Sequence, residues 1–255
     1  MLRPDVRGIF RTVSSARAPA AIKAILLDIE GTTTPISFVY DVLFPYARHH
    51  LANHIERHAS SPEYAQIFNT LRKEQANDVE AGAAGLSSAT GTTAIAAYCA
   101  WLMNRDRKST ALKDLQGRIW EEGYSRGELV GEVFGDVPPA LERWHSRQLS
   151  IGIFSSGSVL AQRLLFRHAS AGDLSSFLSS YFDTTTGAKS ESASYRKIAA
   201  SLAMHPDGVL FVSDAVRELE AARTAGMHTR LAVRPGNPPA EPGGHAVIRT
   251  FDDLG

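Results

Sequence analysis

Short apolar runs alternate with segments of helical periodicity over the C-terminal part of the 255-residue chain, and one further apolar run lies near its start. Each run is bounded by polar or turn residues, which is typical of a buried strand. The predicted strands are 22–29, 149–154, 208–212, 229–233 and 246–251. Apolar residues at three- and four-residue spacing predict helices over 159–168, 195–203 and 216–225. This alternation predicts an α/β fold with a Rossmann-like parallel-sheet core.

The long segment that follows the first predicted strand has helical rather than strand character. Its helical patterns cover 40–58, 64–80, 94–104, 111–124 and 138–146. Residues 81–93, rich in Gly, Ala, Ser and Thr, interrupt these patterns and predict a loop. We therefore expect three parts: an N-terminal extension (1–20), an α/β catalytic core (21–35 and 147–255) and an inserted helical cap (36–146).

Charge and cysteine content narrow the classes of function. The 27 Lys and Arg residues balance the 27 Asp and Glu residues, so no net charge favours nucleic acid or an anionic membrane. Cys99 is the only cysteine, which excludes an intramolecular disulfide and is typical of a reducing compartment. No apolar run is long enough to span a bilayer. We expect a cytoplasmic monomer that binds a small molecule, with neither nucleic acid nor membrane as a partner.

Two carboxylates, Asp28 and Glu30, lie two residues apart at the end of the first predicted strand. Side chains at this spacing point to the same face of a strand. Their charges repel, and a bound divalent cation or a shared proton is the usual way to offset that repulsion. The pair predicts chemistry at this strand end, although a turn cap at Asp28 and a solvated Glu30 also fit the pattern taken alone.

Polar residues follow two further predicted strands. Ser155-Ser-Gly-Ser158 comes after the second strand, Ser213-Asp214 comes after the strand ending at residue 212, and Lys189 lies in a loop before a helix. Ligands of open parallel sheets bind beyond the carboxyl ends of the strands, so we expect these groups to converge. Taken singly, the serines and Asp214 also fit helix caps, and Lys189 fits a solvated loop residue.

These residue types fit the hydrolysis of a phosphate ester. Asp28 could attack phosphorus to form an aspartyl-phosphate, while Glu30 protonates the leaving oxygen and later activates water. A Mg²⁺ ion held by Asp28 and Asp214 would offset the repulsion between nucleophile and phosphate. Lys189 would add a positive charge on the phosphate oxygens, and the Ser155 hydroxyl with neighbouring backbone N–H groups would complete the site.

The same residues resemble a known superfamily. The segments Asp28-Ile-Glu-Gly-Thr, Ser155-Ser-Gly-Ser, Lys189 and Ser213-Asp214 resemble the four motifs of the haloacid-dehalogenase-like phosphotransferases. The stretches 27–46, 106–117, 154–158 and 191–197 resemble the enolase-phosphatase (acireductone synthase) family of the methionine salvage pathway. Most phosphatases of the superfamily carry a second aspartate at the position of Glu30, whereas enolase-phosphatases have the glutamate.

The resemblance implies a bifunctional, magnesium-dependent enzyme. It would enolise 2,3-diketo-5-methylthiopentyl-1-phosphate and then remove the phosphate to give the acireductone. By this resemblance, the catalytic residues are Asp28, Glu30 and Lys189. The substrate is bound by Ser155, Ser156 and Lys189. One Mg²⁺ ion per chain is held by Asp28, Glu30 and Asp214. Glu218, four residues after Asp214, would support the metal site without itself binding the ion.

Two alternatives stay open from the residues alone. The closer one is a Mg²⁺-dependent phosphatase for another small phosphate ester. The more distant one is a phospho-receiver domain, which chain order disfavours because receivers are compact and place their acceptor aspartate on a later strand.

The base for enolisation and the wall of the substrate cavity are open as well. Glu30 is the first candidate for the base, with Lys108 or Lys113 behind it. Phe44, Tyr46 and Trp101 are candidate wall residues, for which buried helix packing is the favoured interpretation.

His50, His54 and His58 recur at four-residue spacing, which could place a transition metal on one helix face. With no supporting carboxylate pattern or cysteine, a solvated helix face is the favoured interpretation.

Overall fold

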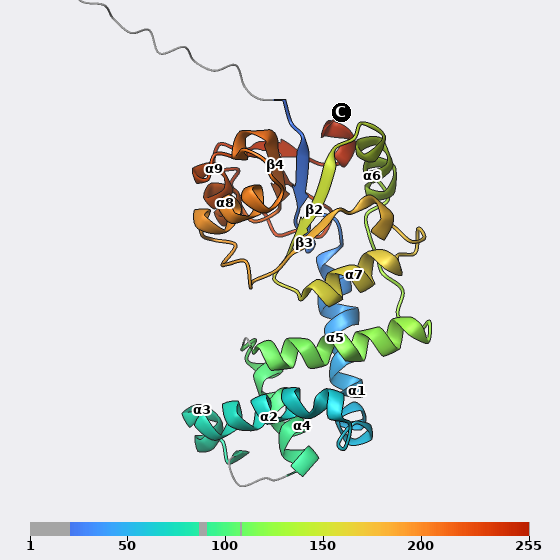
Figure 1. Cartoon of the computed structure of the whole chain (residues 1–255), viewed down its shortest axis with the longest axis vertical. Helices are drawn as coiled ribbons and strands as arrows, with labels where there is room; N and C mark the ends of the chain where they lie inside the picture. Colours follow the sequence, from blue (N-terminus) through green and yellow to red (C-terminus); the bar gives the residue numbers. More distant parts are fainter. Residues whose placement is uncertain (1–20, 87–90, 108, 255) are drawn as a thin grey trace, which may run out of the picture.

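The computed structural model describes residues 21–86, 91–107 and 109–254. Six strands form one sheet in the order β3-β2-β1-β4-β5-β6, and every neighbouring pair is parallel (Figure 1). The strands are β1 (Ala24–Leu27), β2 (Ser150–Phe154), β3 (Ser180–Phe182), β4 (Val209–Ser213), β5 (His228–Ala232) and β6 (Ala246–Ile248). The predicted α/β fold with a Rossmann-like core is confirmed.

Helices cover both faces of this sheet. They are α6 (Val137–Ser146), α7 (Val159–Arg167), α8 (Ser192–Ser201) and α9 (Val216–Thr224), with short helical turns η3 (Ser175–Phe177), η4 (Pro206–Gly208) and η5 (Phe251–Leu254). Alternate residues of β1 point to opposite faces, as the pleat of a strand requires. Leu26 joins the apolar cluster under α8 and α9, whereas Leu27 joins the cluster that extends into α6, α7 and the cap. Because both faces are covered, β1 is buried along its whole length.

The strand predictions missed one element. β3 is a three-residue edge strand of partly buried side chains, too short for an apolar run to mark it. It adds to β2 through the pairing of Gly152 with Ser180. The other predicted strands and the three helices of the core are present, with ends displaced by a few residues.

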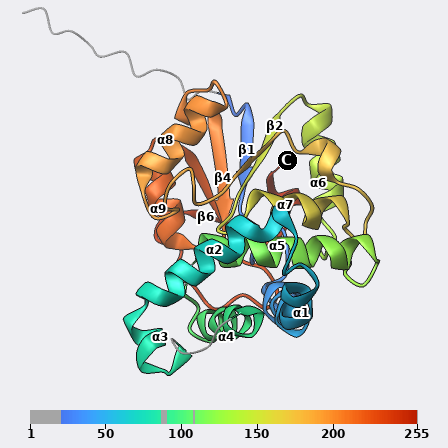
Figure 2. The ribbon, with the colours of Figure 1, turned by 60° about the horizontal axis from the view of Figure 1, so that its bottom comes forward.

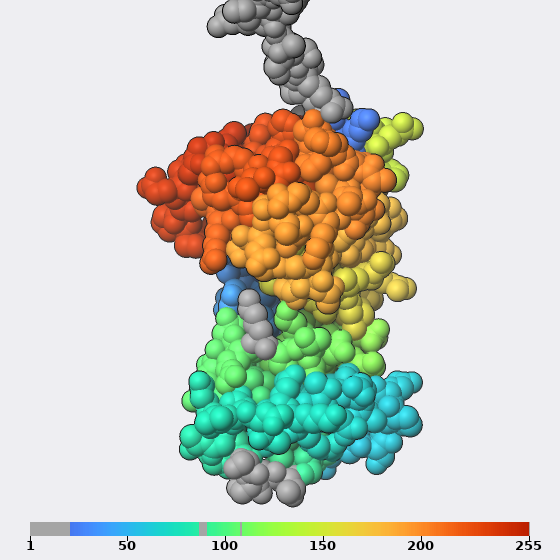
Figure 3. All heavy atoms as spheres, turned by 60° about the vertical axis from the view of Figure 1, so that its left-hand side comes forward, coloured from blue at the N-terminus to red at the C-terminus, as the bar shows by residue number. Residues whose placement is uncertain are grey.

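The segment between β1 and β2 is helical, as predicted. It contains the π-helix η1 (Phe38–Leu43) and the helices α1 (Phe44–Arg57), α2 (Pro62–Asn77), α3 (Val79–Ala83), α4 (Gly91–Asn104) and α5 (Thr110–Ser125), followed by α6. Viewed from below, α1 to α5 lie together beneath the sheet layer (Figure 2). The space-filling view shows these helices as a second lobe under the core (Figure 3).

The predicted loop over 81–93 is wrong at both ends. Helix α3 occupies its start because the Asp78 carboxylate accepts hydrogen bonds from the backbone N–H groups of Glu80 and Ala81, which caps the helix. Helix α4 begins at Gly91, inside the predicted loop. Residues 87–90 lie outside the described residues, as do the predicted N-terminal extension and Lys108.

Helix α6 packs with the core rather than with the cap. It contacts β2 and η5, and its fully buried Trp144 lies 5.3 Å from the ring of Phe251. The predicted division of the chain stays a prediction, and these contacts favour a cap that ends before α6. Among the described residues, no helix combines the length and the apolar character needed to cross a bilayer.

Candidate active site

The carboxylate of Asp28 is buried at the end of β1. The Asp28 backbone N–H donates to the carbonyl of Val212 at 3.0 Å, which continues the pairing with β4 by one residue. The side chain is held from both sides: Oδ1 accepts from Lys189 Nζ at 2.6 Å and from the Ile29 N–H at 2.7 Å, and Oδ2 accepts from the Ser213 hydroxyl at 3.1 Å. The carboxylate is therefore fixed in position before any ligand arrives.

Lys189 lies between two acidic side chains. Its Nζ is 2.6 Å from Asp28 Oδ1 and 2.6 Å from Glu218 Oε2. Burial disfavours the charged ammonium, but the two carboxylates outweigh it and raise the pKa of Lys189. The Tyr195 hydroxyl donates to the Lys189 carbonyl at 2.7 Å and so fixes the loop. A permanent positive charge thus stands beside Asp28.

Asp214 is placed directly against the loop that carries Asp28. Gly31 has a φ of +68°, and a Cβ atom there would lie 2.3 Å from Asp214 Oδ2. The Asp214 backbone N–H donates to the hydroxyl of Thr32 at 3.0 Å. A side chain at position 31 would therefore collide with the Asp214 carboxylate and displace it from this position.

Negative charge accumulates at this edge of the sheet. Burial and, after it, the charge of Asp28 raise the pKa of Asp214 to about 7 and that of Glu218 to about 7. The same two causes raise the pKa of Glu30. The single positive charge of Lys189 does not balance the negative charge of these carboxylates when they are ionised. Carboxylate oxygens are also the ligands that Mg²⁺ prefers. The carboxylates of Asp28 and Asp214, with Glu30 nearby, thus have the chemistry of a divalent-cation site.

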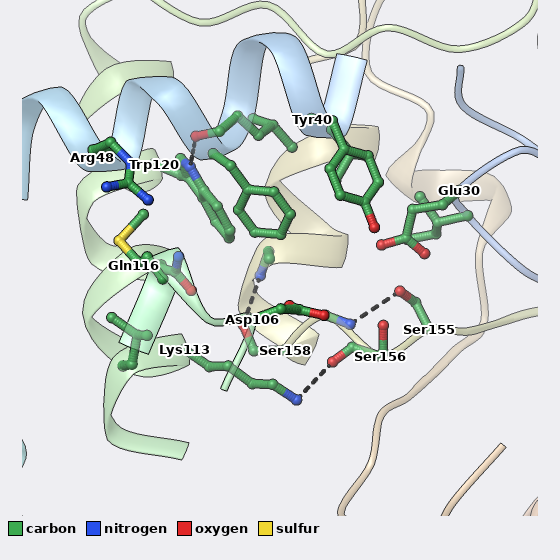
Figure 4. A pocket seen from close by; sticks show the side chains of 18 of the residues that line it. Glu30, Tyr40, Arg48, Asp106, Lys113, Gln116, Trp120, Ser155, Ser156 and Ser158 are labelled. Carbon is green, nitrogen blue, oxygen red and sulfur yellow. Dashed lines mark hydrogen bonds between the residues drawn. The ribbon is translucent and has the colours of Figure 1, made fainter. Parts of the chain in front are cut away.

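A cavity of about 550 Å³ lies between the cap and the strand-end residues next to this cluster (Figure 4), while Asp28, Lys189 and Asp214 themselves are not among its lining residues. Its core side carries Glu30, Ser155 and Ser156, and its cap side includes Tyr40, Phe44 and Trp120. Glu30 and Tyr40 point toward the same end of the cavity in Figure 4, and burial and, after it, the charge of Glu30 raise the pKa of Tyr40. The cavity is thus polar beside the strand ends and largely apolar beneath the cap.

The predicted serines lie where β2 ends. Ser155 is buried, and its hydroxyl accepts from the Gly157 N–H at 3.1 Å, while Ser158 caps α7 through the Ala161 N–H. Lys113 of the cap donates to the Ser156 carbonyl at 2.9 Å, so it joins the cap to the serine loop.

Two of the candidate wall residues do not line the cavity. Phe44 lies in its wall, whereas the Tyr46 hydroxyl turns away and donates to Glu128. Trp101 packs between Tyr98 and Arg105 elsewhere in the cap. For Tyr46 and Trp101 the structure therefore favours the packing interpretation.

Two residues that support the Asp28 loop were not found from the sequence. Arg234 is almost fully buried and donates from Nε to the Thr32 carbonyl at 3.0 Å and from Nη1 to Asp136 at 2.7 Å. Asn237 donates to the Gly31 carbonyl at 2.9 Å. Both follow β5, so the rule that ligand sites lie beyond strand ends could have pointed to them.

Comparison with known proteins agrees with this geometry. Residues 22–226 match the family model of haloacid dehalogenase-like hydrolases. The chain is 54% identical over 238 residues to enolase-phosphatase E1 of Synechococcus elongatus, covering 92% of this chain and 99% of that protein. The chain belongs to the enolase-phosphatase E1 family. Enolase-phosphatase E1 of Pseudomonas aeruginosa is 45% identical, with 91% of this chain and 98% of that protein covered.

Solved structures place this family member in the same fold. The UTR4 protein of Saccharomyces cerevisiae has a TM-score of 0.74 at 33% identity, covering 91% of this chain and 99% of that one. CbbY of Rhodobacter sphaeroides, solved in complex with phosphate, has a TM-score of 0.56 at 15% identity, over 92% of this chain and 96% of that one. The second likeness concerns the fold alone.

Replacing Gly31 by alanine is expected to displace Asp214 and weaken binding of Mg²⁺. Gly127 provides a matched control, because its φ of +70° is almost the same while a Cβ there would meet nothing within 4 Å. Both variants lose about 1–2 kcal/mol from backbone strain. Only Gly31→Ala should also lose the rise in melting temperature caused by Mg²⁺. An equal Mg²⁺ response in both variants would show that the approach of Asp214 to Gly31 is unimportant.

Stabilisation by Mg²⁺ is expected to grow with pH. Asp214 and Glu218 have folded-state pKa values of about 7, against 3.8 and 4.5 for unperturbed groups. Without a cation, the folded chain holds protons that the unfolded chain has released, so the free energy of unfolding falls as pH rises from about 4 to 7. A cation binds the ionised carboxylates, so its stabilising effect increases as these groups lose their protons.

The measurement is thermal unfolding with Mg²⁺ and with chelator at about pH 5.5 and pH 8. The difference in melting temperature should be larger at the higher pH, and Asp214→Asn should remove most of it. A difference independent of pH would contradict the assignment of Asp214 to the cation site.

Proposed function

We propose that this member of the enolase-phosphatase E1 family acts as an acireductone synthase in methionine salvage. It would convert 2,3-diketo-5-methylthiopentyl-1-phosphate to the enol phosphate and then to acireductone and phosphate. The observation that carries this proposal is the 54% identity over 92% of the chain, which includes the cap as well as the core. The geometry of the site supports a separate role for each of its residues.

Asp28 is the proposed nucleophile for phosphate removal. One of its carboxylate oxygens bonds to phosphorus while the bond from phosphorus to the ester oxygen breaks, giving an aspartyl-phosphate. Glu30 donates its proton to the departing oxygen, and its raised pKa suits it to carry that proton. The Glu30 carboxylate then takes a proton from the attacking water, which releases phosphate and restores Asp28.

Lys189, Ser155 and Ser156 are the proposed phosphate-binding groups. The Lys189 ammonium stands beside Asp28, where it offsets the charge that nucleophile and phosphate bring together. Ser155 lies at the end of β2, and Ser156 lies in the same wall of the cavity. Glu218 positions Lys189 rather than contacting phosphate, since it pairs with Lys189 and its Oε2 lies 3.1 Å from the Ser213 hydroxyl, whose single hydrogen is available to either Asp28 or Glu218.

One Mg²⁺ ion per chain is the proposed cofactor, held by Asp28 and Asp214, with Glu30 as the third predicted member of the set. When bound, it supplies positive charge to the phosphate and to the oxygen on which the enolate develops. Haloacid dehalogenase-like phosphatases generally use this ion.

Glu30 is the proposed base for enolisation. Its side chain reaches into the cavity beside Tyr40, where a carbon next to a substrate carbonyl has room to lie. Lys113, the remaining candidate in the described part of the cap, lines the cavity and donates to the Ser156 carbonyl, which favours a role in joining cap and core. The apolar cap side of the cavity, including Phe44 and Trp120, suits the methylthio end of the substrate and excludes water from the enol.

A small phosphate ester is the proposed partner, and a cytoplasmic monomer is the proposed state. The buried and reduced Cys99, whose pKa burial raises to about 12, suits a reducing compartment.

A coupled assay tests the function. Purified protein with Mg²⁺ and the diketo-phosphate should give enol absorbance followed by phosphate release, and a chelator should abolish the release. Phosphate release without the enol would indicate a simple phosphatase for another ester. A single phosphorylation per chain without turnover would indicate a regulatory domain.

Replacing Glu30 by glutamine is expected to impair both half-reactions by at least about 100-fold, because the same carboxylate moves the proton in each. Asp28→Asn provides the contrast, since it removes the nucleophile and should abolish phosphate release, whereas enolisation should fall only by the loss of one proposed Mg²⁺ ligand. The measurement is exchange of solvent deuterium into a non-hydrolysable substrate analogue, together with phosphate release from the substrate. Exchange that persists in Glu30→Gln would assign enolisation to another residue.

A further inference from the structure

A cluster of ligand-type side chains lies in the cap, away from the cavity. His54 of α1 and His58, the residue that ends α1, meet Glu122 of α5. His54 Nδ1 is 3.2 Å from Glu122 Oε1, and His58 Nε2 is 3.0 Å from the same oxygen. The sequence interpretation of a solvated histidine face is wrong for His54, which is 1% exposed, and His50 belongs to a different contact with Tyr46.

His54 is a buried polar group with unmet bonding capacity. Neither of its ring nitrogens forms a hydrogen bond with the described residues, although Nδ1 lies only 3.2 Å from Glu122 Oε1. Leaving such a group unpaired is costly, because it loses the hydrogen bonds that water would otherwise provide. Burial lowers the pKa of His54 to about 4, so its nitrogen is available as a neutral ligand.

We propose that His54, His58 and Glu122 bind a Zn²⁺ ion that joins helices α1 and α5. Two imidazole nitrogens and one carboxylate oxygen form a ligand set that Zn²⁺ uses, with a fourth position left open. At Zn²⁺–ligand distances of about 2.0–2.2 Å, tetrahedral ligand atoms stand roughly 3.2–3.6 Å apart. The two measured separations are close to this, and all three ligand atoms lie within 4.8 Å of one another.

Arg57 and Arg126 lie beside the cluster but do not contact Glu122 Oε1, the oxygen nearest the two imidazoles. Arg57 and Arg126 contact Oε2 at 2.6 and 3.0 Å, whereas the imidazoles face Oε1. They orient the carboxylate, and their own side chains are 43% and 48% exposed, so solvent screens their charge. His58 and Glu122 are each 25% exposed, which gives an ion access from solvent.

The choice of metal follows from the ligands. Mg²⁺ prefers oxygen donors, which dominate at the strand ends, whereas imidazole favours Zn²⁺ and its neighbours among the transition metals. Such an ion would affect the shape of the cavity, because α1 begins with Phe44 and α5 carries Trp120, and both residues lie in the cavity wall. An ion between the C-terminal ends of these two helices would fix their relative position.

The test is a metal titration of untagged full-length protein held at saturating Mg²⁺, which occupies the strand-end site. Wild type should bind one equivalent of Zn²⁺, and Co²⁺ should give the intense visible absorption of a four-coordinate site. A hundred-fold excess of Zn²⁺ over its dissociation constant should raise the melting temperature by roughly 5–10 °C. His58→Gln and Glu122→Gln should weaken binding by more than about 100-fold.

His50→Gln is the matched control. His50 stacks on Tyr46 at a ring distance of 4.2 Å, and His58 stacks on Tyr64 at the same distance, so both variants lose an aromatic contact at the surface of α1. Zn²⁺ binding should survive in His50→Gln. The proposal is overturned if wild type binds no Zn²⁺ in the presence of Mg²⁺, if the Co²⁺ spectrum is weak and octahedral, or if His58→Gln binds as tightly as His50→Gln.

Discussion

The Lys189 ammonium, held between Asp28 and Glu218, is the interaction on which the active site depends. Burial drives carboxylates toward the neutral form, and their mutual repulsion adds to this effect. The contact of 2.6 Å on each side supplies compensating charge at the centre of the group. The parallel sheet makes the arrangement feasible, because β1 and β4 are neighbours and end at the same edge, where Asp28 meets Ser213 and Asp214.

Backbone contacts keep the acidic groups at this short range. Gly31 removes the side chain that would separate the Asp28 loop from Asp214. Arg234 and Asn237, beyond β5, then hold that loop through the carbonyls of Thr32 and Gly31. A buried arginine is costly unless its donors are satisfied, and Arg234 meets part of this requirement through Asp136. Repulsion among the carboxylates is thus resisted by the scaffold as well as by Lys189.

The sequence predicted those parts of the molecule that follow from strong local patterns. Buried strands such as β1 are marked by continuous apolar runs, and Asp28 and Asp214 follow from the topology of a parallel sheet, whereas Lys189 could be assigned only to a loop before a helix. The edge strand β3 carries no such signal. The partner of His54 could not be predicted either, because Glu122 lies on another helix and tertiary packing alone brings the two together.

The cavity offers a physical reason for a glutamate at position 30. Its core side presents serine hydroxyls and the ends of strands, and its cap side presents aromatic and aliphatic groups together with polar side chains such as Arg48 and Gln116. A molecule with a phosphate at one end and an apolar group at the other would place its middle carbons near Glu30. The glutamate side chain is one methylene longer than aspartate, so its carboxylate extends further from the strand end toward Tyr40. In the proposed mechanism, that reach would let one residue serve the ester oxygen at the strand end and a carbon-bound proton deeper in the cavity.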